Sequence, residues 1–244
     1  MKEHRRFYEL CRAIVTPFIH FVEKLDVTGL ENIPARGPVI MVGNHITFMD
    51  IPTIGFYVKR HQHHMGKIEL FRVPVLGAIM RGLDAFPVRR GEGDRESLRT
   101  AEELLGAGQM LVVFPEGHRS RTGKMAAGLA GVALIAMRTG APIVPVGIAG
   151  TERVLKGHYG PWAPTVHVVY GTPFTLEVSG KRRREDLERG IDTIMRHIAA
   201  LVPPEYRGVY ADAPAVAALN ASPVVAETSS GESAADASVP PAGG

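Results

Sequence analysis

The chain has 244 residues, 45% hydrophobic and 22% charged, which is enough apolar material for one full-sized core rather than several small ones. The net charge is +3, and the segment from Ala211 to Gly244 holds four acidic residues and no Lys or Arg, so residues 1–210 carry +7. This balance favours phosphate-bearing substrates and anionic lipid. Nucleic acid is not expected, because no recognisable binding module accompanies the charge. The single cysteine, Cys11, excludes an intrachain disulfide and a multi-thiolate metal site.

Three segments are expected along the chain. Residues 1–24 form an amphipathic helix that associates with membrane, and residues 25–210 form one folded domain. Residues 211–244 are rich in Ala, Pro and Ser with scattered acidic residues, a composition that predicts a disordered tail.

The N-terminal segment has helical periodicity, with its apolar residues near one face and basic residues on the flanks. Those apolar residues are Phe7, Leu10, Cys11, Ile14, Phe18, Phe21 and Val22. Charged residues interrupt the segment, so neither a cleaved signal nor a bilayer-spanning helix is predicted. A helix of this kind can lie in the membrane interface, or it can pack as a surface helix on the domain's own core. Periodicity alone does not separate these two interpretations.

Beyond this helix, short apolar runs alternate with longer helical patterns, which predicts an α/β fold with a largely parallel central sheet flanked by helices. The predicted strands are 38–42, 85–88, 110–114, 143–148 and 166–170, and the predicted helices are 50–58, 71–81, 94–106, 126–138 and 184–201. Ligands of such sheets bind beyond the carboxyl ends of the strands, so the residues that follow these runs are the first candidates for function.

His45 and Asp50 follow the first apolar run, five residues apart. A strand-to-helix turn can fold Asp50 back so that it holds the Nδ1 proton of His45, which leaves Nε2 as a general base. The pair would serve acyl transfer without a protein nucleophile. Alternatively, Asp50 only caps the helix that Pro52 helps to start, and His45 is an ordinary loop histidine.

A second cluster, Phe114-Pro115-Glu116-Gly117-His118-Arg119-Ser120-Arg121, directly follows another apolar run. It combines a glycine for close backbone approach, a carboxylate that can bind a hydroxyl, and two guanidiniums that can bind phosphate. These groups together suit a glycerol phosphate, although as an isolated string they could also form a solvated loop.

Asn44-His45 with Asp50, followed by Phe114-Pro115-Glu116-Gly117 with Arg119, resembles the glycerolipid acyltransferase family that makes phosphatidic acid from lysophosphatidic acid. Three further blocks match in order: Lys67-Ile68-Glu69-Leu70-Phe71, Phe86-Pro87-Val88-Arg89-Arg90-Gly91 and Ile143-Val144-Pro145-Val146. The resemblance covers roughly residues 25–175, and the ordered set is more specific than any single motif. His118 departs from the family, which usually has a small hydroxyl residue there.

The resemblance implies an acyltransferase domain that moves a fatty acyl group to the sn-2 hydroxyl of 1-acylglycerol 3-phosphate, giving phosphatidic acid for phospholipid synthesis. His45 would take the proton of that hydroxyl while Asp50 orients the imidazole. The implied substrate-binding residues are Asn44, Arg90, Glu116, Gly117 and Arg119. No cofactor is expected beyond the acyl thioester, carried by coenzyme A or by acyl carrier protein. The oxyanion donors are not identified; backbone N–H groups around His45 and a nearby basic group are candidates.

Two other readings stay open. A related acyltransferase would use a different acceptor, such as another lysophospholipid, glycerol 3-phosphate, or an acylated amino acid or sugar, and a non-catalytic lipid-binding protein would carry the motifs as relics. His61, His63 and His64 suggest a metal, but no accompanying Cys or carboxylate pattern supports one, so no metal is predicted. The expected location is the cytoplasmic face of the cell membrane, as a peripheral or monotopic protein.

Overall fold

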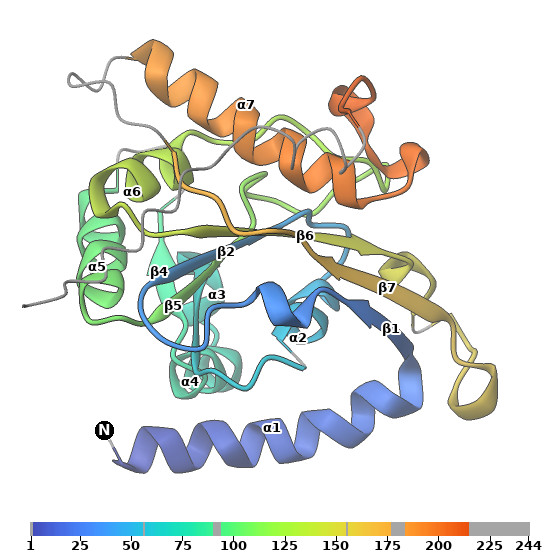
Figure 1. Cartoon of the computed structure of the whole chain (residues 1–244). Coiled ribbons are helices and arrows are strands. Elements are labelled where there is room, and N and C mark those ends of the chain that lie inside the picture. The colour runs from blue at the N-terminus through green and yellow to red at the C-terminus, as the bar shows by residue number, and fades with distance from the viewer. Residues whose placement is uncertain (1, 56, 90–93, 155, 177–183, 215–244) are drawn as a thin grey trace, which may run out of the picture.

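The computed structural model describes residues 2–55, 57–89, 94–154, 156–176 and 184–214 (Figure 1). Its strands are β1 (Lys24–Thr28), β2 (Val39–Gly43), β3 (Gln62–Lys67), β4 (Phe86–Val88), β5 (Met110–Val113), β6 (Ile143–Ala149) and β7 (Thr165–Tyr170). Its helices are α1 (Lys2–Val22), α2 (Asp50–Gly55), α3 (Ile68–Phe71), α4 (Pro74–Gly82), α5 (Arg95–Gly106), α6 (Gly131–Thr139) and α7 (Arg184–Leu201). Short 3-10 helices include η2 (Thr151–Arg153), η3 (Gly160–Trp162) and η5 (Gly208–Tyr210).

The strands form one sheet in the order β1-β7-β6-β2-β5-β3-β4. Every neighbouring pair is parallel except β6 and β7. The predicted α/β fold with a largely parallel sheet is therefore confirmed.

The core lies on both faces of the sheet, because successive side chains of a strand point to opposite faces. On β2, Ile40 and Val42 join the cluster that contains residues of α5, α6 and α7, whereas Val39 and Met41 join the cluster that contains residues of α1 and α2. Figure 1 shows the same division, with α7 above the sheet and α1 below it. Strands covered on both faces are apolar throughout, which is why β2, β5 and β6 were visible in the sequence.

Two strands were missed by the sequence pattern, and each lacks a continuous apolar run. β1 lies at an edge of the sheet and alternates between exposed and half-buried residues. β3 contains His63 and His64 together with the buried Gln62, whose side-chain amide donates to the carbonyl of Gly55. The histidine-rich stretch is thus a sheet strand, and burial lowers the pKa of His64 to about 4.

Two predicted helices have different bounds, for local reasons. The helix predicted from residue 126 begins at Gly131, because the N–H groups of Ala126 and Leu129 bond to Glu116 and to the carbonyl of Pro115. The helix predicted over 71–81 begins instead at Pro74, as α4, and Phe71 ends the separate α3, since Val73 takes the extended backbone expected before Pro74.

The domain extends past residue 210, where the sequence placed its end. Ala213 is 5% exposed and lies in the core cluster, while Asp212 forms a 3.1 Å ion pair with Arg196 of α7. The predicted tail therefore begins later than Ala211, and the rest of it lies outside the described residues.

Helix α1 packs on the domain along one side and leaves apolar side chains exposed on another, while its predicted place in a membrane interface stays a prediction. Ile19 and Val22 are buried against the sheet, whereas Phe18 and Phe21 are 47% and 56% exposed. No helix in the described part of the chain is both long enough and apolar enough to cross a bilayer.

Candidate active site

Three neighbouring parallel strands deliver the polar groups of the site. β6, β2 and β5 lie side by side, so their carboxyl ends share one edge of the sheet. His45 follows β2, Glu116 follows β5 and Thr151 follows β6. All three residues are buried, at 8%, 1% and 1% exposure. The chain thus brings together residues that are more than a hundred positions apart in sequence.

His45 and Asp50 form a hydrogen-bonded pair. Nδ1 of His45 lies 2.8 Å from Oδ2 of Asp50, and the same oxygen accepts the N–H groups of Ile46 and Thr47. These bonds fold the turn back on itself, as predicted for the five-residue spacing. Asp50 bonds backward into this turn and not forward to the first N–H groups of α2, which contradicts the alternative in which it is only a helix cap.

Thr151 completes the surroundings of Asp50 and was not singled out in the sequence. Its hydroxyl donates to Oδ1 of Asp50 at 2.6 Å. Asp50 therefore accepts four donors at 0% exposure, and these hydrogen bonds hold its carboxylate in place beside the imidazole. The only available signal was position, because Thr151 directly follows the apolar run of β6 and Gly150.

The other imidazole nitrogen, Nε2, is the one that Asp50 does not engage. A carboxylate only accepts hydrogen bonds, so the proton of neutral His45 resides on Nδ1 and the lone pair on Nε2. Nε2 has no hydrogen-bond partner among the described residues, and Phe114 stacks on the ring with centroids 4.2 Å apart. The hydroxyl of the nearby Ser120 bonds away from the histidine, to the carbonyl of Lys124. His45 is thus poised to act on a hydroxyl supplied by a substrate.

Glu116 ties the two predicted motifs together. Its two oxygens accept the N–H groups of His45 and Ala126, both at 2.9 Å. Burial raises the pKa of Glu116, while these two hydrogen bonds lower it. The carboxylate binds backbone in this structure, so its predicted contact with the acceptor stays a prediction.

Gly117 and Asn44 also have structural roles. Gly117 has φ 72°, and a Cβ there would meet Cδ1 of Leu129 at 2.6 Å, so only glycine fits this turn. The side chain of Asn44 is 1% exposed and bonds to both the N–H and the carbonyl of Ile148. The amide nitrogen and the amide oxygen of Asn44 are thereby both engaged in joining the end of β2 to β6. Its predicted contact with substrate stays a prediction.

Arg119 is the arginine of the cluster 114–121 to which the family resemblance assigns a substrate contact. Its side chain is exposed, with no ion pair in the described part of the chain, and the adjacent Ser120 donates its N–H to the carbonyl of His45 at 2.7 Å. This bond fixes the loop beside the catalytic pair. Arg90 lies outside the described residues, and its neighbour Arg89 is exposed at the end of β4.

The backbone around His45 offers few oxyanion donors. The N–H groups of His45, Ile46 and Thr47 are all engaged by the carboxylates of Glu116 and Asp50. The sequence suggested two kinds of oxyanion donor, backbone N–H groups around His45 and a nearby basic group. Because these three N–H groups are occupied, a basic group is the better candidate.

A further buried carboxyl group, Glu23, lies near the pair. It follows α1, is 0% exposed, and accepts the hydroxyl of Thr53 of α2 at 2.7 Å, while its other oxygen has no hydrogen-bond partner among the described residues. Burial raises the pKa of Glu23 to about 7; the Thr53 bond opposes this shift and nearby Asp50 adds to it. Sequence analysis did not mark Glu23, because only the fold brings it to α2.

Several known proteins are similar to this chain in sequence. The acyltransferase family model matches residues 24–149, just over half of the chain. The chloroplastic 1-acyl-sn-glycerol-3-phosphate acyltransferase BAT2 of Brassica napus is 31% identical over 57% of this chain and 44% of its own length. A 1-acyl-sn-glycerol-3-phosphate acyltransferase of Bacillus subtilis is 29% identical over 59% of this chain and 71% of its own.

A solved structure extends the comparison to the fold. The 1-acyl-sn-glycerophosphate acyltransferase PlsC from Thermotoga maritima superposes with a TM-score of 0.56 at 29% identity, covering 82% of this chain and 79% of that one. The chain spans less than half the length of the Brassica relative, and its likeness to the bacterial proteins is more nearly complete.

Proposed function

Because the chain belongs to the acyltransferase family, we propose that it transfers a fatty acyl group from a thioester to the sn-2 hydroxyl of 1-acylglycerol 3-phosphate, giving phosphatidic acid. The observation that carries this proposal is the buried His45–Asp50 pair, whose Nε2 has no protein hydroxyl or thiol to activate among the described residues. The acceptor follows from the relatives, which are named for this lysolipid.

In the proposed reaction, Nε2 of His45 removes the proton of the acceptor hydroxyl as its oxygen attacks the thioester carbonyl carbon. Asp50 holds the imidazole and stabilises the imidazolium that forms. When the tetrahedral intermediate collapses, the carbon–sulfur bond breaks and the imidazolium returns the proton to the leaving thiolate. The reaction needs no cofactor beyond the acyl donor, for which coenzyme A and acyl carrier protein are both considered.

We propose that the enzyme works at the cytoplasmic face of the cell membrane, held there by α1. The exposed Phe18 and Phe21 face away from the core, and a helix with one buried side and one apolar outer side suits a membrane interface. A lysolipid acceptor resides in the membrane, so docking by α1 would bring the site to its substrate.

Arg119→Ala should raise the KM for lysophosphatidic acid about ten- to a hundredfold, because a charge-assisted contact to the phosphate is lost. The melting temperature should barely change, since Arg119 is exposed. Steady-state kinetics of the purified variant measure the first effect. Arg99→Ala on α5, where the exposed Arg99 pairs with Glu103, is the matched control and should leave KM unchanged. Unaltered kinetics in Arg119→Ala would show that this arginine is only a surface charge.

Acyl transfer by the purified protein tests the proposed function. Labelled acyl-coenzyme A and acyl carrier protein thioesters are offered separately with lysophosphatidic acid, and then with other lysophospholipids, glycerol 3-phosphate and lipidated amino acids or sugars. Product with lysophosphatidic acid supports the proposal, product only with another acceptor supports the related-acyltransferase reading, and lipid binding without any product supports the non-catalytic one.

A further inference from the structure

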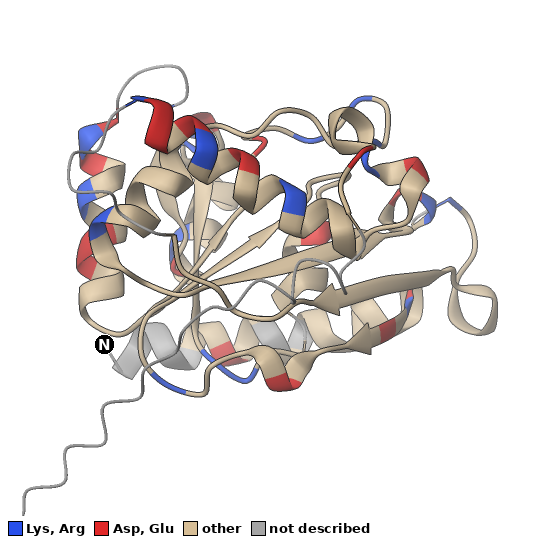
Figure 2. Cartoon of the chain, turned by 45° about the horizontal axis from the view of Figure 1, so that its top comes forward, with Lys and Arg blue, Asp and Glu red and all other residues tan. Residues whose placement is uncertain are grey.

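The exposed large apolar side chains gather on the side of the sheet that carries α1. They lie on the outer surface of α1, around α2, along α3 and α4, and on the loop before β7. They include Phe7, Leu10, Phe18, Phe21, Phe48, Ile51, Leu70, Val75, Leu76, Ile79, Tyr159 and Trp162. Helix α1 contacts α2, α4 and η3, so these elements are neighbours. Figure 2 shows charged residues of both signs on α5 and α7, which contribute buried residues to the core cluster of the other face.

Trp162 is the most exposed of these side chains, at 76%, and the loop that carries it is held in place. Tyr159 stacks on Phe21 of α1, with ring centroids 5.6 Å apart and planes 8° from parallel. Nζ of Lys24 donates to the carbonyl of Pro161 at 2.7 Å. Ala163, which follows Trp162, is buried at 5% exposure. The indole is therefore presented outward by a loop fixed to the end of α1.

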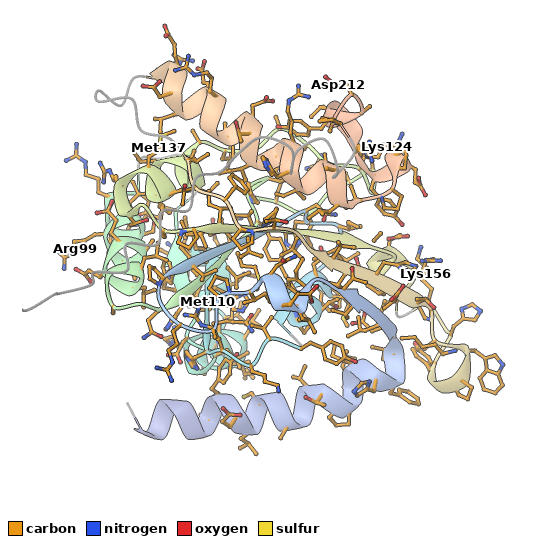
Figure 3. The ribbon with its side chains drawn as sticks, viewed as in Figure 1. Arg99, Met110, Lys124, Met137, Lys156 and Asp212 are labelled. Carbon is orange, nitrogen blue, oxygen red and sulfur yellow. The ribbon has the colours of Figure 1, made fainter. Side chains whose placement is uncertain are left out.

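The charge of this loop suits an anionic surface. Lys156 and His158 are exposed, and residues 156–162 contain no acidic residue. Figure 3 shows Lys156 at the β1 and β7 side of the molecule, far from Arg99 on α5. Trp and Tyr side chains favour the boundary between lipid and water, because each has an apolar ring and a polar group.

We propose that Tyr159 and Trp162 form a second membrane anchor, which enters the surface of a leaflet containing anionic phospholipid beside α1. This inference rests on the proposed function, since a lysolipid acceptor gives the enzyme a reason to sit on a leaflet. A second contact beside the end of α1 restrains the tilt of the domain on the membrane more than α1 does alone. Basic Lys156 adds attraction to anionic headgroups.

The experiment uses the fact that Trp162 is the only tryptophan in the chain. Intrinsic fluorescence of the whole protein therefore reports on this residue alone. With vesicles of phosphatidylcholine and phosphatidylglycerol, emission should shift to shorter wavelength and brominated lipid should quench it. Sedimentation with the same vesicles should show that Trp162→Ser lowers partition roughly tenfold, because a large apolar side chain no longer leaves water. Val209→Ser, at a 65% exposed valine of η5, is the control and should partition normally.

Vesicle-bound protein with unshifted, unquenched emission would overturn the proposal, as would protein that does not bind these vesicles. A shift that grows with protein concentration in the absence of lipid would also overturn it, and would assign the surface to a second copy of the chain. Acyl transfer measured in detergent micelles separates this inference from the proposed function. Trp162→Ser should keep wild-type turnover there, whereas failure of the proposed function would remove product from wild type and variant alike.

Discussion

Asp50→Asn should lower kcat for acyl transfer by about a hundred- to ten-thousandfold without unfolding the protein. The amide has the size of the carboxylate, and its oxygen can still accept from Ile46, Thr47 and His45 while its nitrogen donates to Thr151. The variant thus keeps the turn but loses the negative charge that stabilises the imidazolium during proton transfer. Single-turnover and steady-state rates measure this loss, and thermal unfolding checks the fold.

A surface pair offers a matched control for this substitution. Asp26 on β1 lies 2.9 Å from Nδ1 of His167 on β7, nearly the same distance as in the buried pair, but both side chains are more than half exposed. Asp26→Asn should leave kcat unchanged, because His167 lies within β7 and outside the candidate active site. A kcat near wild type in Asp50→Asn would mean that His45 needs no charged partner and would remove Asp50 from the mechanism.

Glu23→Gln should remove one contribution that lowers stability as pH rises from 5 to 8, so the wild-type protein should lose stability relative to the variant over this range. The pKa of Glu23 is raised by burial to about 7, from an ordinary value of 4.5. A carboxyl group with a raised folded-state pKa contributes stability that is fully present below pH 4.5 and is lost as pH rises through about 7. The lost contribution over pH 5 to 8 is about 2–3 kcal/mol.

Urea unfolding of wild type and Glu23→Gln at a series of pH values measures this difference. Other buried groups with shifted pKa values, such as Glu116 and His64, are present in both proteins and cancel. Glu31→Gln, at an exposed carboxylate of the 3-10 helix Leu30–Asn32, should retain the wild-type pH dependence. Parallel curves for wild type and Glu23→Gln would show that Glu23 is ionised at neutral pH in the folded state.

The fold was largely predictable because β2, β5 and β6 are buried on both faces and therefore read as apolar runs. β3 was not predictable, since it begins with polar residues and the buried Gln62 bonds to the carbonyl of Gly55, a contact that depends on a neighbouring element. The start of α6 was wrong for a similar reason: the N–H of Ala126 bonds to a carboxylate ten residues earlier, and no local pattern signals that bond.

The reacting pair was predictable because His45 and Asp50 are local in sequence and follow a strand. The groups that hold the pair are not local. Thr151 lies 101 residues from Asp50, and Glu116 lies 71 residues from His45. Family motifs flagged Glu116 as a substrate contact, whereas its two hydrogen bonds in the structure are to backbone. Asn44 is a second example. The family resemblance implied that it binds substrate, whereas its side chain bonds to the backbone of Ile148.

The measurement that tests the central claim most directly is acyl transfer by wild type and His45→Ala, with labelled acyl-coenzyme A or acyl carrier protein and lysophosphatidic acid. The variant removes the only imidazole of the pair, so its turnover should fall by at least about a hundredfold, with phosphatidic acid formed by the wild type alone. Thermal unfolding confirms that the variant is folded. Wild-type turnover by folded His45→Ala would contradict the assignment of His45 as the base.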